Sequence, residues 1–206
     1  MIQPLLSDDA LLTDIAAAVD DIGAFHLWWL GQSGFLLKWN GRRLLIDPYL
    51  SDSLTKKYAA TDKPHVRMTA IPIDPARLSG IDVVTSSHNH TDHLDHETLW
   101  PLLGANPEMR MVIPEANRAF VAERLRSDPA WSAGLNDGTS VELAGFRLTG
   151  LAAAHEQLEQ DEQGNYRCLG YLIAFGPHTI FHPGDAVPYP GMAARLLALA
   201  GGRRID

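Results

Sequence analysis

Four histidines, His88, His90, His93 and His96, fall within nine consecutive residues of this 206-residue chain, which has nine histidines altogether. The residues directly before them, Ile81–Ser86, form a short apolar and β-branched run that predicts a buried strand. If the chain stays extended beyond the strand, the side chains of His88 and His90 point to the same side. Their imidazoles can then bind one metal ion at about 2.0–2.1 Å. The segment therefore predicts a metal site at the end of a strand.

Asp92 and His93 follow at the next bend of the same segment. Adjacent residues at a bend point in different directions, so this second pair suits a neighbouring metal better than the first one. Thr91 or Asp92 can cap a helix that begins at Leu94, which would make the turn rigid. The alternative is a polar surface loop that contains histidines by chance, but turn chemistry has no need for repeated imidazoles.

Composition excludes several other classes of protein. With 46% hydrophobic and 20% charged residues, a chain of this length can bury the core of one globular domain. The net charge of −8 argues against a nucleic-acid-binding surface. The single cysteine, Cys168, excludes an intrachain disulfide and fits a reducing compartment, so we predict a cytoplasmic protein. No apolar run approaches the ~18 residues of a membrane span. The partner we expect is a small-molecule substrate, and a homo-oligomer stays open.

Hydrophobic periodicity and turn residues predict an alternation of helices and strands. We expect helices over 8–20, 96–103, 114–126 and 192–200, and strands over 26–30, 35–39, 42–47, 81–86, 109–113, 140–151 and 166–181. Asn40-Gly41 favours a type I′ hairpin turn between two of the strands. Residues 48–80 are rich in Pro, Ser, Asp and Thr and are typical of a long surface excursion that borders a binding site.

The segment His88-Asn-His-Thr-Asp-His93 resembles the signature of the metallo-β-lactamase-fold hydrolases. The similarity extends to Trp28–Gly34, to Leu45–Asp52 and to His182-Pro-Gly-Asp185, and these blocks look most like the branch of L-ascorbate-6-phosphate lactonase-like proteins. The resemblance implies an α/β (α+β) fold, a four-layer αβ/βα sandwich of two mixed β-sheets flanked by helices.

The resemblance also implies further site residues. One metal would be bound by His88, His90 and His155, a second by Asp92 and His93, and Asp185 would bridge the two. Asp47 is either a turn residue or, as in the family, the carboxylate that orients a ligand imidazole. The substrate-binding residues are unknown.

One ligand of the family pattern has no counterpart, because no histidine follows Asp185. The family supplies its last ligand after one more strand, and Arg203–Asp206 reads like the first residues of such a strand. We therefore expect a single domain, 1–206, that is truncated at its C-terminus, and a second metal site that is weak or empty.

The expected activity is metal-dependent hydrolysis of a lactone or another ester-type small molecule. A divalent metal lowers the pKa of its bound water to about 7, so a hydroxide nucleophile is available at neutral pH. Asp92 would orient this hydroxide and accept its proton. Imidazole and carboxylate ligands without thiolate suit one or two ions of zinc, manganese or iron.

Three alternatives stay open. The first is a phosphodiesterase or phospholipase-like hydrolase on the same fold. The second is a catalytically impaired metal-binding module, because the last ligand is missing. The third is an amidohydrolase barrel, which would place its His-x-His on the first strand of a longer chain, whereas several strands precede the motif here.

Overall fold

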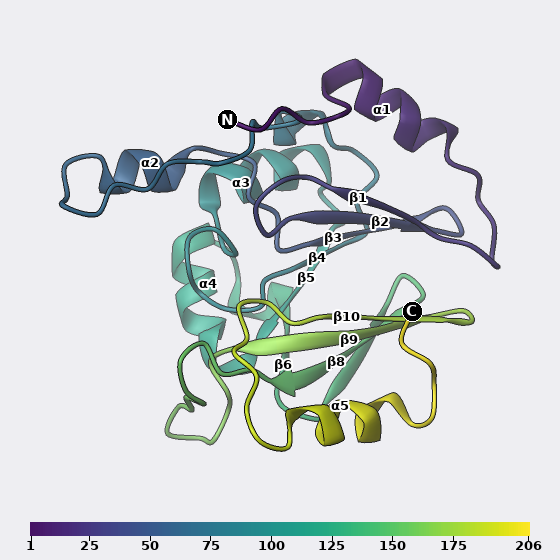
Figure 1. Ribbon diagram of the computed structural model, residues 1–206, viewed down its shortest axis with the longest axis vertical. Coiled ribbons are helices and arrows are strands. Elements are labelled where there is room, and N and C mark those ends of the chain that lie inside the picture. Colours follow the sequence, from purple (N-terminus) through teal and green to yellow (C-terminus); the bar gives the residue numbers. More distant parts are fainter. The chain divides into compact units, whose positions relative to one another are not determined.

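The computed structural model describes residues 1–206, in which strands and helices alternate along the chain as the sequence predicts (Figure 1). The strands form two sheets flanked by helices, one with the order β1-β2-β3-β4-β5-β6 and one with the order β10-β9-β8-β7. The chain divides into two compact units: Met1–Val84 with His90–Met109, and Thr85–Asn89 with Arg110–Asp206. None of the helices has the length and apolarity that crossing a membrane requires.

The first unit is built around an antiparallel meander to which one parallel strand is added. Its elements are α1 (Asp8–Ala17), β1 (His26–Trp29), β2 (Phe35–Trp39), β3 (Arg42–Ile46), α2 (Ser53–Tyr58), β4 (Val83–Thr85) and α3 (His96–Ala105). The β2–β3 turn has φ of 47° at Asn40 and 74° at Gly41, so the predicted type I′ turn is confirmed. The predicted buried strand before the histidine cluster is β4, and all three of its residues are buried.

Helix α1 begins at the predicted residue but ends at Ala17, three residues earlier than expected. Its two buried residues are Leu11 and Ile15, and the buried Lys38 of β2 donates hydrogen bonds to the carbonyls of Ile15 and Ala18. These bonds satisfy carbonyls at the end of the helix, where intrahelical donors run out. Helix α1 therefore ends where Lys38 supplies hydrogen bonds to its last carbonyls.

The prediction that residues 48–80 form a surface excursion is wrong in part. Tyr49, Leu50, Ile73 and Leu78 of this segment are buried. The side chain of Arg67 is buried as well, and it donates hydrogen bonds to three main-chain carbonyls, those of Tyr49, Ser51 and Thr69. The polar composition of the segment hid these anchors, because the arginine that organises it reads as a surface residue.

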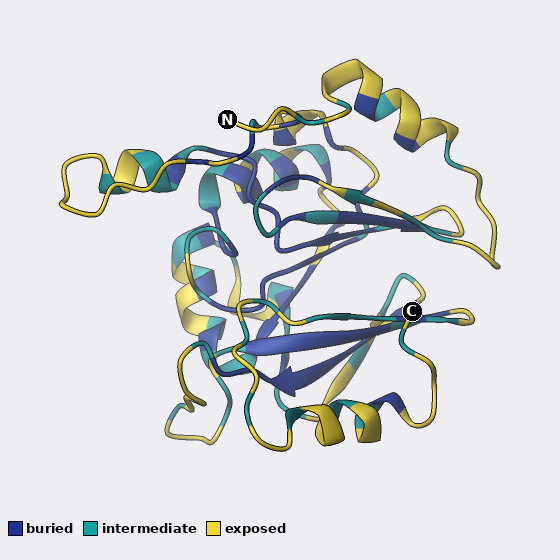
Figure 2. Ribbon diagram, viewed as in Figure 1, coloured by how far each residue is buried: buried dark blue, intermediate teal, exposed yellow.

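The second unit contains a parallel pair of strands and an antiparallel sheet. Its elements are β5 (Arg110–Pro114), α4 (Arg118–Leu125), β6 (Ser132–Leu135), β7 (Ser140–Leu143), β8 (Phe146–Ala152), β9 (Leu169–Phe175), β10 (His178–His182) and α5 (Met192–Ala200). Strand β6 was not predicted. The predicted strand 140–151 is two strands, which turn at Ala144 (φ 50°) and Gly145 (φ 84°). Figure 2 shows the central strands β8 and β9 of the antiparallel sheet largely buried and most of α5 exposed.

Candidate metal centre

His88, His155 and Asp185 lie together in the second unit, although long stretches of sequence separate them. Each follows the end of a strand: His88 comes after β4, His155 after β8 and Asp185 after β10. Asp185 Oδ2 is 3.9 Å from His88 Nε2 and 3.8 Å from His155 Nε2. The ligand nitrogens of His88 and His155 lie within 4.8 Å of each other. The fold thus brings two imidazoles and one carboxylate around one point.

The main chain around these three residues is fixed by hydrogen bonds within the same unit. The N–H of Leu169, at the start of β9, donates to the carbonyl of Ser87, which adjoins His88. The N–H of Val187 donates to the carbonyl of Ala154, and this bond joins the Asp185 turn to the residue before His155. The loops that carry the three side chains are therefore tied to neighbouring segments by main-chain hydrogen bonds.

The spacing and chemistry of this cluster fit a divalent cation. Ligand bonds of about 2.0–2.1 Å in a tetrahedral site place the ligand atoms about 3.4 Å apart. The distances of 3.8 and 3.9 Å to Asp185 are within half an ångström of that separation. The side chain of His88 is 2% exposed, whereas those of His155 and Asp185 are 38% and 43% exposed, so solvent reaches the cluster from one side.

A narrow crevice with no room for a water molecule adjoins the cluster. Its lining includes His88, His155 and Asp185 together with Ser87 and Cys168. Cys168 is half-buried, and burial raises the pKa of its thiol. The lining thus offers imidazole and carboxylate groups together with one thiol.

Asp92 and His93 lie in the first unit, where Asp47 holds the imidazole. Asp47 Oδ2 is 2.7 Å from His93 Nδ1, and both side chains are almost fully buried. His93 Nε2 is 3.8 Å from Asp92 Oδ2. A carboxylate on one ring nitrogen leaves the other nitrogen to act as a ligand, which is how metal-binding histidines are usually oriented. Of the two roles predicted for Asp47, the geometry therefore fits the carboxylate that orients a ligand imidazole.

The turn that carries Asp92 and His93 is fixed by the side chain of Ser33 and by main-chain hydrogen bonds. Ser33 Oγ, from the β1–β2 loop, is 2.8 Å from the carbonyl oxygen of Asp92 and 3.1 Å from that of Asp47. His90 is exposed, and its carbonyl accepts hydrogen bonds from the N–H groups of His93 and Leu94. The turn is thus closed by main-chain bonds and tied to the first hairpin.

The predicted helix cap at Thr91 or Asp92 is wrong, because α3 begins at His96 and Asp95 is its N-cap. The Asp95 carboxylate accepts hydrogen bonds from the N–H groups of Glu97 and Thr98 and from the hydroxyls of Ser51 and Thr98. Aspartate is a preferred N-cap residue, so the sequence did carry a signal for a cap at Asp95. The Asp92 side chain therefore does not cap the helix.

His96 belongs to the histidine-rich segment but not to the predicted ligands. Its ring packs edge-on against Trp100 of the same helix, with ring centroids 4.7 Å apart. This contact gives His96 a packing role within the helix.

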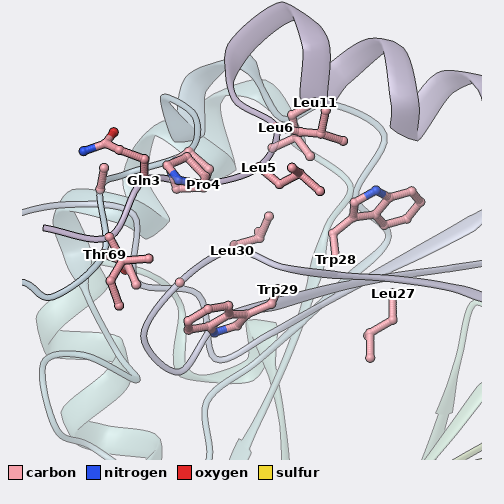
Figure 3. A pocket seen from close by; sticks show the side chains of 14 residues that line it. Gln3, Pro4, Leu5, Leu6, Leu11, Leu27, Trp28, Trp29, Leu30 and Thr69 are labelled. Atoms are coloured by element: carbon pink, nitrogen blue, oxygen red, sulfur yellow. The ribbon is translucent and has the colours of Figure 1, made fainter.

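A separate cavity of about 380 Å³ lies in the first unit, between the N-terminal segment, α1 and β1 (Figure 3). Leu6, Leu11, Trp28, Trp29 and Leu30 contribute to its largely apolar wall. No histidine, cysteine or carboxylate lines it, so it is not a metal site.

Comparison with known proteins places these features in a family. The chain is 28% identical over 160 residues to a UPF0173 metal-dependent hydrolase from Methanosarcina mazei, which covers 76% of this chain and 59% of that protein. It is 33% identical over 162 residues to the N-acyl-phosphatidylethanolamine-hydrolyzing phospholipase D of Saccharomyces cerevisiae, covering 76% of this chain and 33% of the yeast protein. The chain thus spans 59% of the length of the archaeal relative.

Among solved structures, CmlA, a diiron beta-hydroxylase from Streptomyces venezuelae, shares the fold with a TM-score of 0.64 at 21% identity. The match covers 92% of this chain and 34% of CmlA. Residues 26–193, most of the chain, match the family described as the beta-lactamase superfamily domain. The chain therefore belongs to the beta-lactamase superfamily.

Proposed function

We propose that this chain carries the catalytic domain of a metal-dependent hydrolase. The observation that carries the proposal is the cluster of His88, His155 and Asp185, whose ligand atoms have nearly the spacing that a divalent cation requires. The family match spans residues of both compact units, which supports one functional domain over residues 1–206.

We assign the ligands in two sets that share Asp185. One set is His88, His90, His155 and Asp185, and the other is Asp92, His93 and Asp185. We assign His90 to the same set as His88 because only one residue separates the two histidines in the chain. The second set has fewer ligands, so we expect it to bind its metal more weakly. Zinc, manganese and iron all suit this combination of nitrogen and oxygen ligands.

The residues of this site would hold a divalent cation, which when bound would lower the pKa of a water molecule to about 7 and make a nucleophile available at neutral pH. We assign to Asp92, whose side chain is 35% exposed, the role of orienting the attacking water and accepting its proton. Asp47 keeps the ring of His93 in one orientation through the hydrogen bond at Nδ1. Ser33 donates a hydrogen bond to the main-chain carbonyl of Asp92 and so holds the backbone from which the carboxylate projects.

For the substrate we propose a lactone or another ester-type small molecule, which follows from the resemblance to the L-ascorbate-6-phosphate lactonase-like branch. A phosphodiester is the second candidate, because a yeast relative with 33% identity is named as a phospholipase D. A cytoplasmic location and a homo-oligomeric state stay predictions.

The test is hydrolysis of a small panel of lactone, phosphodiester and thioester substrates by the zinc- and the manganese-loaded protein. We expect turnover of one class, abolished by His88→Ala and by Asp92→Ala. His96→Ala is the matched control, because it removes a histidine of the same segment that packs against Trp100, and it should retain activity. Undiminished turnover in Asp92→Ala would exclude its assigned role, and tight metal binding without any hydrolysis would favour a metal-binding module.

A further inference from the structure

The hydroxyl of Ser87 lies beside the ring nitrogen of His88 that points away from the proposed metal. Ser87 follows β4 directly, its side chain is buried, and its Oγ is 3.0 Å from His88 Nδ1. The other nitrogen of the same ring, Nε2, faces Asp185 Oδ2 at 3.9 Å. The two nitrogens of one imidazole thus have separate neighbours, a hydroxyl on one side and the ligand cluster on the other.

The direction of this hydrogen bond decides whether His88 can be a ligand. A neutral imidazole carries its proton on one nitrogen and a lone pair on the other. If Nδ1–H donates to Ser87 Oγ, the lone pair lies on Nε2 and points into the cluster. If the hydroxyl donates to Nδ1 instead, Nε2 carries the proton and cannot bind a cation.

Ser87 also touches the segment that carries the third ligand. A Cβ atom on Gly184 would lie 2.7 Å from Ser87 Oγ and 2.8 Å from Ser87 Cβ, so the Gly184–Asp185 turn packs directly on this serine. Gly184 has a φ of +59°. One side chain therefore contacts both the ring of His88 and the turn that presents Asp185.

We propose that Ser87 is a positioning residue of the metal site. Its oxygen accepts the Nδ1–H of His88, which fixes the tautomer and the ring orientation that leave Nε2 to the metal, while its side chain supports the Asp185 turn. The inference rests on the proposed metal site. Outer partners of this kind change metal affinity by about 10- to 100-fold when they are removed.

Ser86 provides a matched control in the same strand ending. It is as buried as Ser87, but its hydroxyl donates to the main-chain carbonyl of His88 at 2.7 Å and not to the ring. Ser86→Ala therefore removes an equally buried hydrogen bond to the same residue without changing what the imidazole contacts.

The experiment measures the zinc affinity of the purified chain by competition with a chromophoric chelator, together with the melting temperature of the metal-free protein. We expect Ser87→Ala to weaken zinc binding about 10- to 100-fold, with wild-type affinity in Ser86→Ala. Equal affinities of Ser87→Ala and wild type would overturn the inference and leave the metal site standing. No zinc binding by the wild type would overturn the proposed function and the inference with it.

A second pair of variants tests the contact between Ser87 and the Gly184–Asp185 turn. This pair does not require that Ser87→Ala folds. Gly184→Ala pushes a methyl group against the Ser87 side chain, whereas Gly201→Ala has the same φ of +59° and nothing within 4 Å of the added atom. The two variants share the backbone strain, but only Gly184→Ala meets Ser87, and only Gly184 adjoins the proposed ligand Asp185. We expect weaker zinc binding in Gly184→Ala alone, and equal affinities in the two variants would contradict the assignment.

Discussion

Replacement of Asp47 tests the orienting contact that the structure places behind His93. The carboxylate is fully buried, and its Oδ2 lies 2.7 Å from Nδ1 of a histidine that is itself 1% exposed. Asp47→Ala removes this acceptor in a place that water does not reach. Asp47→Asn is the matched control, because its amide oxygen has nearly the same position and can still accept from Nδ1–H.

The size of the effect follows from burial and from the backbone. Loss of one partner of a buried hydrogen bond costs about 1–3 kcal/mol, and more if the histidine is charged. Asp47 also has a φ of +42°, a conformation that costs most residues about 1–2 kcal/mol and that asparagine tolerates well. We expect Asp47→Ala to lower the free energy of unfolding by about 2–4 kcal/mol and Asp47→Asn by about 1 kcal/mol.

Urea unfolding followed by circular dichroism measures both values, and chelator competition gives the zinc affinity of the same samples. For a chain of this size, 1 kcal/mol shifts the melting temperature by about 2–4 °C, so the alanine variant should melt about 4–16 °C lower. If Asp47→Ala stays within about 0.5 kcal/mol of wild type, the range of ordinary surface changes, the reasoning is refuted.

Other consequences can be checked with the same preparations. Asp95→Ala should lower the free energy of unfolding by about 2–4 kcal/mol, since it removes a helix cap and the acceptor of two buried hydroxyls; Asp128→Ala, which caps only an exposed turn, should cost at most about 1 kcal/mol. Iodoacetamide should alkylate Cys168 more slowly at pH 8 in the folded than in the urea-unfolded chain, because burial raises the thiol pKa and lowers the thiolate fraction; equal rates would contradict this. A chelator should lower the melting temperature of the zinc-loaded protein, and added zinc should restore it.

Local patterns in the sequence predict the elements whose causes are local. The Asn40-Gly41 turn and the buried run before the histidines are set by residues close in the chain, and both are found in the structure. The buried anchors of residues 48–80 were missed because they depend on Arg67, whose guanidinium reaches carbonyls up to 18 residues away. Charge and composition alone cannot distinguish such an arginine from a solvated one.

In the candidate site, too, some features have local causes in the sequence and others depend on contacts between distant parts of the chain. The spacing of His88 and His90 after a strand indicates a metal site without further knowledge. The meeting of His88 with His155 and Asp185, 67 and 97 positions further along the chain, depends on how β8 and β10 run, and only the family resemblance indicated it. The contact between Ser87 and Gly184 had no sequence signal, because serine before a ligand and glycine before an aspartate are each common in turns.

Titration of the wild-type chain and of His155→Ala with zinc in an isothermal calorimeter tests the central claim that His88, His155 and Asp185 bind one cation together. The account predicts one tight equivalent per chain in the wild type and a large loss of affinity when the His155 imidazole is removed. Unchanged zinc affinity and stoichiometry in His155→Ala would contradict it.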